Sequence, residues 1–204
     1  MTNALEHITL EVTDVTAAER FYAAFGLGDR LRLRASDAPT AGFRGFTLSL
    51  VVSRPADVRA LVDAAAAAGA TVVKPVTRSM WGHGGVVRAP DGTIWKVATS
   101  AKKENGPATG EIDSVVLLLG VADVVASKKL YLDHGLTAGK SFARMYVEFD
   151  TAPVKLALYR RKALAKDAGV APEGTGSHRI ALGGTDAFTD PDGFTWGTTV
   201  AAAS

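Results

Sequence analysis

Cysteine is absent from all 204 residues. The chain therefore has no disulfide framework, no thiolate metal ligand and no cysteine nucleophile, which fits a reducing compartment. A strong charge of one sign is also missing, because 23 basic residues stand against 21 acidic ones and the net charge is +2. The basic residues are dispersed along the chain, so no field suited to a polyanion is expected. These absences exclude a disulfide-rich fold and predict no nucleic-acid partner.

A long hydrophobic run is missing too. The alanine-rich segment 64–68 is the longest of its kind and is far shorter than a membrane span. The opening residues, MTNALEHITL, contain neither a basic leader nor an apolar stretch of the signal-peptide type. We therefore expect no membrane partner and a cytoplasmic location. With 47% hydrophobic residues, the chain is able to bury a substantial core.

An internal repeat is the clearest pattern that is present. The hexapeptides PDGTIW and PDGFTW occur once in each half, and Asp14, Tyr22 and Gly26 recur as Asp123, Tyr131 and Gly135 at one constant spacing. The segment between the copies, TSAKKENGPATGE, is polar, rich in turn-forming residues and without periodicity, which is typical of a linker. The sequence predicts domains at 1–98 and 112–204, joined by a linker at 99–111.

Hydrophobic periodicity predicts the elements of the first copy. HITLEV at 7–12 alternates as a half-buried strand, and a helix is expected after a capping Asp14. Further strands are expected at 30–34 and 47–52, followed by a helix that begins near Pro55 and ends before Gly69. Three short strands, TVVKPV, GGVVRA and TIWKVAT, complete the pattern. The units are predicted to be βαβββ modules.

These motifs carry a resemblance to a known family. LEHITLEVTDVTAAERFYAAFGL, WGHGG and APDGTIWKV are similar to the vicinal oxygen chelate superfamily, which includes glyoxalases, bleomycin-resistance proteins and extradiol dioxygenases. The second half resembles it through VADVVASKKLYLDHGL, GSHRIAL and DPDGFTWG, with too few residues between the last two motifs for a second helix. The resemblance implies an α+β fold in which tandem βαβββ modules form curled mixed sheets with helices on the convex face.

A cup on the concave face is the binding site that the resemblance implies. The polar sides of the predicted strands would then line this cup, namely His7, Thr9, Glu11, Thr47 and Ser49. From the residues alone, the alternative is that these side chains face solvent on an open sheet.

The resemblance also implies where a metal would be held. Family members that do chemistry bind a divalent cation through a first-strand histidine, a ligand on the first strand of the partner module and a glutamate after the Pro-Asp-Gly turn. His7 occupies the first position, Thr47 falls near the second, and Lys96 replaces the glutamate. An ammonium about 4 Å from a divalent ion repels it by roughly 8 kcal/mol at an effective dielectric near 20. We expect no metal and no other cofactor, with His7 as a weak candidate ligand and a divalent ion as the alternative.

Four further residues are candidates for ligand contact. Met80 and Trp81 lie in the segment before a pair of glycines, and Glu148 shares a strand face with Tyr146. His178 belongs to the predicted strand GSHRIAL, in which either His178 or the following arginine points inward, not both.

Three functions remain open at this point. The leading hypothesis is a metal-free protein that sequesters or senses a small organic molecule, with Lys96 favouring an anionic or carbonyl-bearing ligand. The second is a metal-dependent lyase or dioxygenase that uses His7 with Glu11, Glu148 or His178, or an isomerase with His7 as base, although no catalytic residue can be assigned. The third is a pseudo-enzyme that acts in protein association through exposed sheet edges. Either a monomer or a homodimer is expected.

Overall fold

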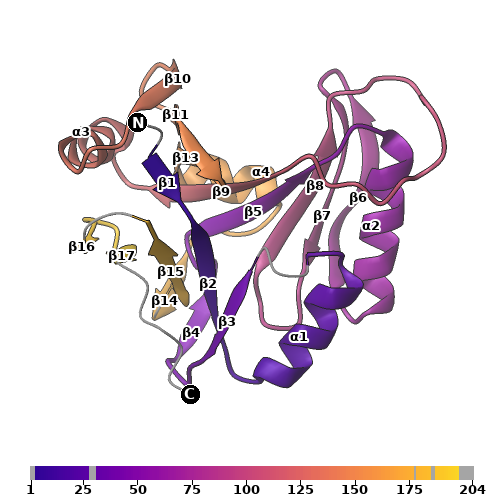
Figure 1. Ribbon diagram of the computed structural model, residues 1–204, viewed down its shortest axis with the longest axis horizontal. Coiled ribbons are helices and arrows are strands. Elements are labelled where there is room, and N and C mark those ends of the chain that lie inside the picture. Colours follow the sequence, from indigo (N-terminus) through magenta and orange to yellow (C-terminus); the bar gives the residue numbers. More distant parts are fainter. Residues whose placement is uncertain (1–2, 28–30, 177, 185–186, 198–204) are drawn as a thin grey trace.

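Seventeen strands and four helices make up the part of the chain that the computed structural model describes, which is residues 3–27, 31–176, 178–184 and 187–197 (Figure 1). The elements before the linker are β1 (Asn3–Leu5), β2 (His7–Val12), α1 (Val15–Ala24), β3 (Arg32–Ala35), β4 (Thr40–Gly42), β5 (Phe46–Val51), α2 (Pro55–Ala67), β6 (Thr71–Ser79), β7 (Gly82–Arg88) and β8 (Ile94–Thr99). The elements after it are β9 (Ser114–Val121), α3 (Val124–Asp133), β10 (Ala138–Phe142), β11 (Tyr146–Phe149), β12 (Thr151–Pro153), β13 (Lys155–Arg160), α4 (Arg161–Ala168), β14 (Gly174–Gly176), β15 (Ile180–Gly183), β16 (Phe188–Thr189) and β17 (Thr195–Gly197).

Two large sheets each combine strands from both halves of the chain. The first sheet has eight strands in the order β10-β11-β13-β9-β5-β8-β7-β6, and the second has five in the order β16-β17-β15-β2-β3. The halves join through antiparallel pairs, β5 with β9 in the first sheet and β2 with β15 in the second. Two short pairs, β1-β12 and β4-β14, add further links between the halves. The α+β fold of mixed sheets built from repeated modules, predicted from the sequence, is confirmed.

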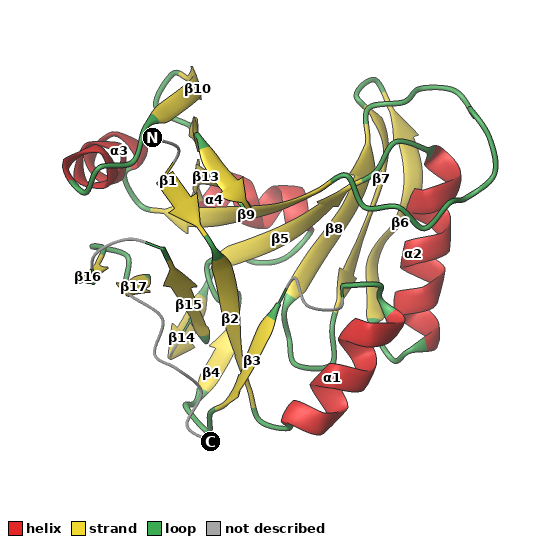
Figure 2. Cartoon of the chain, in the orientation of Figure 1, coloured by secondary structure: helices red, strands yellow, loops and turns green. Residues whose placement is uncertain are grey.

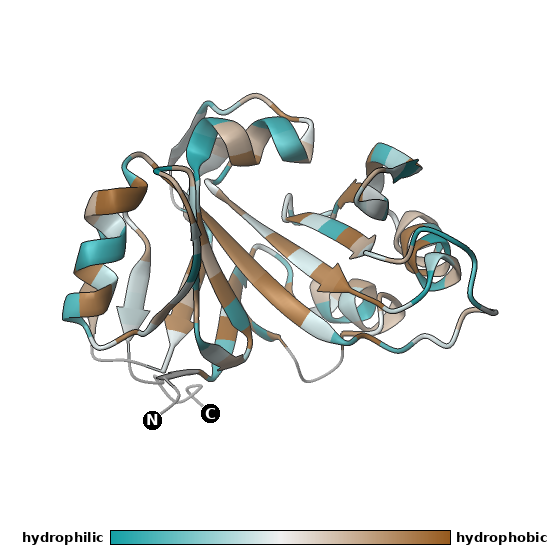
Figure 3. Cartoon of the chain, turned by 90° about the horizontal axis from the view of Figure 1, so that it is seen from above, coloured by the Kyte–Doolittle hydropathy of each residue, from teal (hydrophilic) through white to brown (hydrophobic). Residues whose placement is uncertain are grey.

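The main core lies on one face of each sheet. Leu48 and Leu50 of β5 and Ile8 and Leu10 of β2 are fully buried in the same hydrophobic cluster, which also includes Trp95. Helices α1, α2 and α3 contribute their apolar sides to this cluster (Figure 2). In Figure 3 the hydrophobic stretches concentrate on the central strands, while the helices alternate hydrophobic and hydrophilic residues. Burial of one large apolar side chain contributes about 1.5–3 kcal/mol, so this cluster is a major stabilising contribution.

The repeated Pro-Asp-Gly turns are each tied to a helix by a tyrosine. The hydroxyl of Tyr22 on α1 donates to Asp91 at 2.6 Å, and that of Tyr131 on α3 donates to Asp190 at 2.8 Å. The acceptor in the first copy is the aspartate of the turn, whereas in the second copy it is the residue before the turn proline. Gly92 adopts φ +87°, as the sequence predicts for this turn. The repeated hexapeptide therefore marks a contact between turn and helix.

Helix α4 covers the face of the first sheet opposite to the main core. Its residues Leu164, Ala165 and Ala168 form a second cluster with Phe43, Val86 and Ile94, each less than 6% exposed. In Figure 1, α4 lies behind β9, with which it is in contact. A Cβ atom at Gly120 of β9 would come within 3.2 Å of the Arg161 Cα atom, so glycine there permits the close approach of the helix.

Polar contacts fix the C-terminal end of α4. The Lys74 ammonium donates to the carbonyl oxygens of Lys166 (3.1 Å) and Asp167 (2.5 Å), which the end of a helix leaves unpaired. The Lys96 ammonium pairs with the Asp167 carboxylate at 2.7 Å, and Gly169 ends the helix in the left-handed conformation with φ +78°. The sequence did not predict this helix, and its position changes the interpretation of the site.

Most predicted elements appear within one or two residues of their expected bounds. The alternating strand at 7–12, the helix capped by Asp14 and the helix beginning at Pro55 are all present. The prediction that the second half lacks its second helix is wrong, because α4 follows β13 as α2 follows β5, well before the segment between β15 and β17. No helix in the described part of the chain is long and apolar enough to cross a membrane.

We predict that Leu164→Ala lowers the free energy of unfolding by about 2–5 kcal/mol, because it opens a cavity beneath α4. The exposed Lys162 on the same helix supplies the control, and Lys162→Ala is expected to change stability by at most about 0.5 kcal/mol. Asp167→Asn removes a partly exposed ion pair and is expected to cost less than about 1 kcal/mol. Urea denaturation measures all three, and equal effects of Leu164→Ala and Lys162→Ala would contradict the packing of α4 on the sheet.

We also predict that Asp57→Asn loosens the linker. Asp57 of α2 is 1% exposed and accepts hydrogen bonds from the backbone N–H groups of Thr109 (2.6 Å) and Gly110 (2.8 Å). Burial alone would raise the pKa of Asp57, but these bonds outweigh it and hold the pKa below its ordinary value. The stabilisation of the folded state by the Asp57 carboxylate is thus fully present above the unfolded-state pKa of Asp57. It is lost as the pH falls through the lower folded-state pKa of this residue.

The expected loss for Asp57→Asn is about 1–3 kcal/mol at neutral pH, measured by urea denaturation. Asp63→Asn, an exposed change on the same helix, is the matched control and should be nearly neutral. The difference between the Asp57→Asn variant and the unaltered chain should shrink on acidification below about pH 4. A difference that stays constant down to pH 2 would show that the carboxylate does not hold the linker.

Candidate functional site

The predicted cup residues Thr47, Ser49 and Lys96 share one face of the first sheet. Ser49 of β5 is paired in register with Lys96 of β8, so the two side chains lie side by side. Thr47 and Ser49 are only 4% and 7% exposed. Helix α4 lies on this face, and its Asp167 pairs with the Lys96 ammonium. The expectation of an open cup at this face is therefore wrong, because the chain fills it with its own helix.

His7 lies in the other sheet, together with Thr9 and Glu11. It is paired in register with Gly183 of β15, where the absent Cβ leaves room for the imidazole ring. Its Nε2 atom is 3.3 Å from the Arg32 guanidinium. Partial burial and the charge of Arg32 lower the pKa of His7, so the ring is neutral at neutral pH. The predicted convergence of His7 with Thr47 and Lys96 is wrong, because strand pairing places them in different sheets.

The neighbours of His7 are occupied by polar pairs within the same sheet. The Glu11 carboxylate forms an ion pair with Arg34, the residue beside it in the parallel register of β2 and β3. Thr9 is paired in register with Arg32. Arg32 and Arg34 thus lie on the hydrophilic side of β3 and contact the polar side of β2.

Glu148 lies on the same face of the first sheet as Ser49 but three strands away. The Tyr146 hydroxyl donates to the Glu148 carboxylate at 2.9 Å, which confirms that the two share a face. Burial and the hydrogen bond to Glu148 both raise the pKa of Tyr146. Glu148 therefore has a partner of its own and is not adjacent to Lys96.

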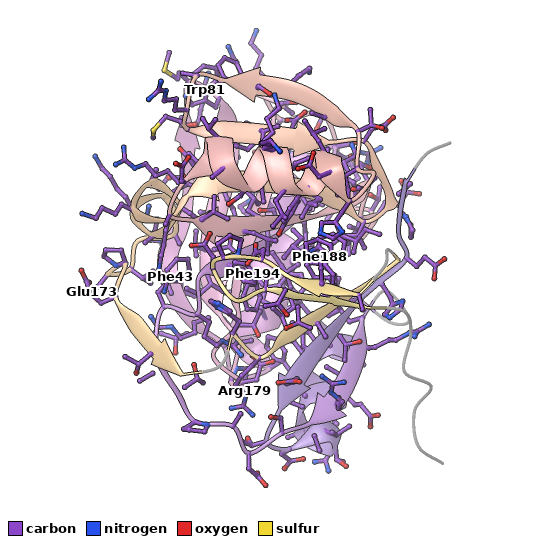
Figure 4. The ribbon with its side chains drawn as sticks, turned by 90° about the vertical axis from the view of Figure 1, so that its left-hand side faces the viewer. Phe43, Trp81, Glu173, Arg179, Phe188 and Phe194 are labelled. Atoms are coloured by element: carbon purple, nitrogen blue, oxygen red, sulfur yellow. The ribbon has the colours of Figure 1, made fainter. Side chains whose placement is uncertain are left out.

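Met80 and Trp81 form the tip of the hairpin between β6 and β7. Their side chains are 73% and 79% exposed. Figure 4 shows Trp81 at one end of the molecule, far from Phe43 and Arg179. The proposed role of these two residues in ligand contact stays a prediction, and a ligand at the clefts described below would not reach them.

His178 and Arg179 both point into the protein, although the sequence analysis allowed only one of them to do so. Strand β15 begins after them, at Ile180, and Arg179 adopts φ +58°, so the alternation of a strand does not apply. The His178 ring lies between two carbonyl oxygens, with Nδ1 2.5 Å from that of Arg44 and Nε2 2.6 Å from that of Asp192. Arg179 donates to the carbonyl oxygen of Ser36.

Two clefts open where the β4-β14 ribbon meets the two sheets. The first, of about 490 Å³, is called the His178 cleft here and is lined among others by Phe43, Arg161 and His178. The second, of about 510 Å³, is called the Arg179 cleft and is lined among others by Arg88, Ile94 and Arg179. Phe43, Arg44 and Glu173 line both clefts. Volumes of this size suit small organic ligands.

Arg44 is the functional candidate that the sequence analysis missed. It lies between β4 and β5 and is only 7% exposed. Its Nη2 atom donates to the Thr93 hydroxyl at 2.6 Å and lies 3.9 Å from the Asp91 carboxylate, and the guanidinium stacks over Phe46. Burial lowers the pKa of Arg44, which Asp91 opposes and Arg179 reinforces. The sequence signal was an arginine inside the apolar segment FRGF, and its burial depended on tertiary contacts.

The side chains at the positions where the sequence resemblance implies a metal do not form a suitable donor set. Thr47 and Lys96 supply a hydroxyl and an ammonium beneath α4, while His7 lies in the other sheet beside Arg32. Within the described ranges, no group of three or more histidine, aspartate or glutamate side chains is arranged to hold a metal ion. Metal sites of this kind need several neutral nitrogen or anionic oxygen donors around one ion. The described residues therefore do not fit the divalent cation that the fold implies.

No curated protein sequence matches the chain significantly. Glyoxalase I from Zea mays is 13% identical, with 95% of this chain and 91% of that chain covered and a TM-score of 0.60. A putative dioxygenase from Bacillus subtilis subsp. subtilis str. 168 is also 13% identical, with 94% and 72% covered and a TM-score of 0.56. Identities this low show a shared fold and nothing finer.

A family model provides the evidence from sequence. The model of the Glyoxalase/Bleomycin resistance protein/Dioxygenase superfamily matches residues 29–97. This segment includes β3 to β7 and most of β8, with the first Pro-Asp-Gly turn and Lys96. The segment 29–97 is thus similar to the Glyoxalase/Bleomycin resistance protein/Dioxygenase superfamily, and over nearly its whole length the chain shares the fold of glyoxalase I.

Proposed function

We propose that the chain is a small-molecule-binding protein of the glyoxalase/bleomycin-resistance type that works without the family's metal centre. The observation that carries the proposal is the pair formed by Lys96 and Asp167. An ammonium stands where the family holds a carboxylate, and its counter-ion comes from the helix that covers the face. The position is thus used to hold α4 in place, and the repulsion of a divalent ion by Lys96 opposes metal binding.

The ligand is assigned to the Arg179 cleft. This cleft offers apolar walls from Phe43, Ile94 and Val170 beside the polar groups of Arg44 and Arg179. Small-molecule sites combine apolar walls with fixed polar groups that orient the ligand, and this cleft has both. The face beneath α4, by contrast, is filled with side chains packed at van der Waals distance.

A ligand screen with cleft variants tests this assignment. A compound from a panel of aromatic drugs and small oxoacids is expected to raise the melting temperature, because a ligand at 100 times its Kd adds about 2.7 kcal/mol of stability. Ala171→Trp, at the exposed lining of the cleft, should abolish the shift. Ala67→Trp, an exposed change on α2, should leave it unchanged. If no compound shifts the melting temperature, or if Ala171→Trp has no effect on one that does, the assignment fails.

Metal analysis tests the second half of the proposal. Protein purified without chelators is expected to contain no stoichiometric zinc, nickel, manganese or iron, and His7→Ala should leave the metal content unchanged. A stoichiometric ion that disappears in His7→Ala would contradict the proposal and favour a lyase or dioxygenase of the same superfamily.

Protein association is a second candidate function, favoured by one observation. Three large apolar side chains at two hairpins are more than two-thirds exposed, namely Met80, Trp81 and Phe142. These hairpins lie at opposite ends of the eight-stranded sheet, whose edge strands are β6 and β10. Exposed edges and apolar tips promote pairing between chains. Analytical sedimentation tests self-association. If it shows only monomer at high protein concentration, self-association is rejected as part of this second function.

A further inference from the structure

The Arg179 cleft contains more positive than negative charge. Arg44 and Arg179, each 7% exposed, and the exposed Arg88 line it, against two carboxylates, Asp91 and Glu173. A buried guanidinium is strongly disfavoured unless it is paired and hydrogen-bonded. The buried Arg44 guanidinium therefore needs more compensation than a surface arginine would.

The carboxylates of the cleft provide little of this compensation. Asp91 stands 3.9 Å from Arg44, and its two oxygens already accept bonds from the Tyr22 hydroxyl (2.6 Å) and the Thr93 backbone N–H (2.7 Å). Glu173 is exposed, and in Figure 4 it lies at the outer margin of the molecule, well apart from Arg179. Asp91 is thus shared among several donors, and Glu173 is screened by water.

The Arg44 guanidinium is incompletely bonded as well. Among the described residues its buried Nη1 atom has no hydrogen-bond acceptor, although Nη2 donates to Thr93. Buried guanidinium groups normally use their five N–H donors on carboxylate, phosphate or carbonyl oxygens. An unpaired donor on a buried cation, in a cleft that a second buried cation lines, indicates a place for an anionic oxygen.

We propose that the Arg179 cleft recognises an anionic group, a carboxylate or a phosphate, on a small molecule with an aromatic or apolar body. The inference rests on the proposed function, because it concerns the same cleft and specifies the class of ligand. The anionic group lies between Arg44, Arg88 and Arg179, and the body of the molecule lies along Phe43, Ile94 and Val170. Guanidinium groups suit both anions because they bind two oxygens at once.

A pair of isosteric probes tests the inference directly. Benzoate and benzamide have the same shape, but only benzoate carries a charge, and phenyl phosphate extends the test to phosphate. Titration at constant ionic strength should show that benzoate or phenyl phosphate binds at least about tenfold more tightly than benzamide, as expected for a charge-assisted hydrogen bond. If only phenyl phosphate binds, the anion is a phosphate, and if only benzoate binds, it is a carboxylate.

Variants identify the residues responsible. Arg44→Met keeps the size of the side chain and removes the charge, and it should weaken binding of the anionic probe at least about tenfold. Arg88→Gln is an exposed change that leaves the core intact, and it should weaken binding several-fold even if Arg44→Met does not fold. Arg78→Gln, an exposed change on β6 outside the clefts, is the matched control and should have no effect.

Two results would overturn the inference in distinguishable ways. Equal affinity for benzoate and benzamide, with both lost in Ala171→Trp, would reject anion recognition and leave the proposed function in place. No binding of any probe, together with a ligand screen in which no compound shifts the melting temperature, would reject both. Anion binding that Arg44→Met and Arg88→Gln leave unchanged would place the anion elsewhere and also reject the inference.

Discussion

The packing of α4 on the first sheet is the constraint on which the rest of the structure depends. The face opposite to the main core presents Val86, Ile94 and Leu118, which need an apolar cover. On a sheet that curls around a ligand, this face would be open to the ligand. Here Leu164 and its neighbours on α4 pack on this face instead. The salt bridge from Lys96 to Asp167 adds orientation more than energy, because both side chains are more than a third exposed. This face of the first sheet is thus part of the protein's own core.

The clefts follow from how the two halves combine. Since β5 pairs with β9 and β2 with β15, each sheet contains strands of both copies, and the connection from β4 to β5 has to pass between the sheets. His178 fixes this connection by contacting the carbonyl oxygens of Arg44 and Asp192 at once. Arg44 is held in the interior by the same connection, beside the turn that contains Asp91. A buried cation at the junction of two sheets is costly in stability, and such sites are common places for binding.

Local periodicity predicted much of the fold and little of the site. The strand HITLEV and the helix capped by Asp14 depend on neighbouring residues, and both are present. Which strands pair is a long-range property, and the repeat alone did not show that His7 and Lys96 belong to different sheets. The position of α4 depends on the apolar side of the sheet and on Gly120, which are far from it in sequence. Arg44 had no periodic signal, since its burial arises only where the halves meet.

Native-state amide hydrogen exchange of residues 164–168 is the most direct test of the central claim that α4 forms part of the folded core. If α4 is packed on the sheet as described, these amides exchange only through openings whose free energy approaches that of β5 and β9. Exchange as fast as that of the exposed Val125 and Ala126 in the first turn of α3, many times faster than β5, would contradict the account. In that case the face that carries Thr47, Ser49 and Lys96 would be open to a ligand after all.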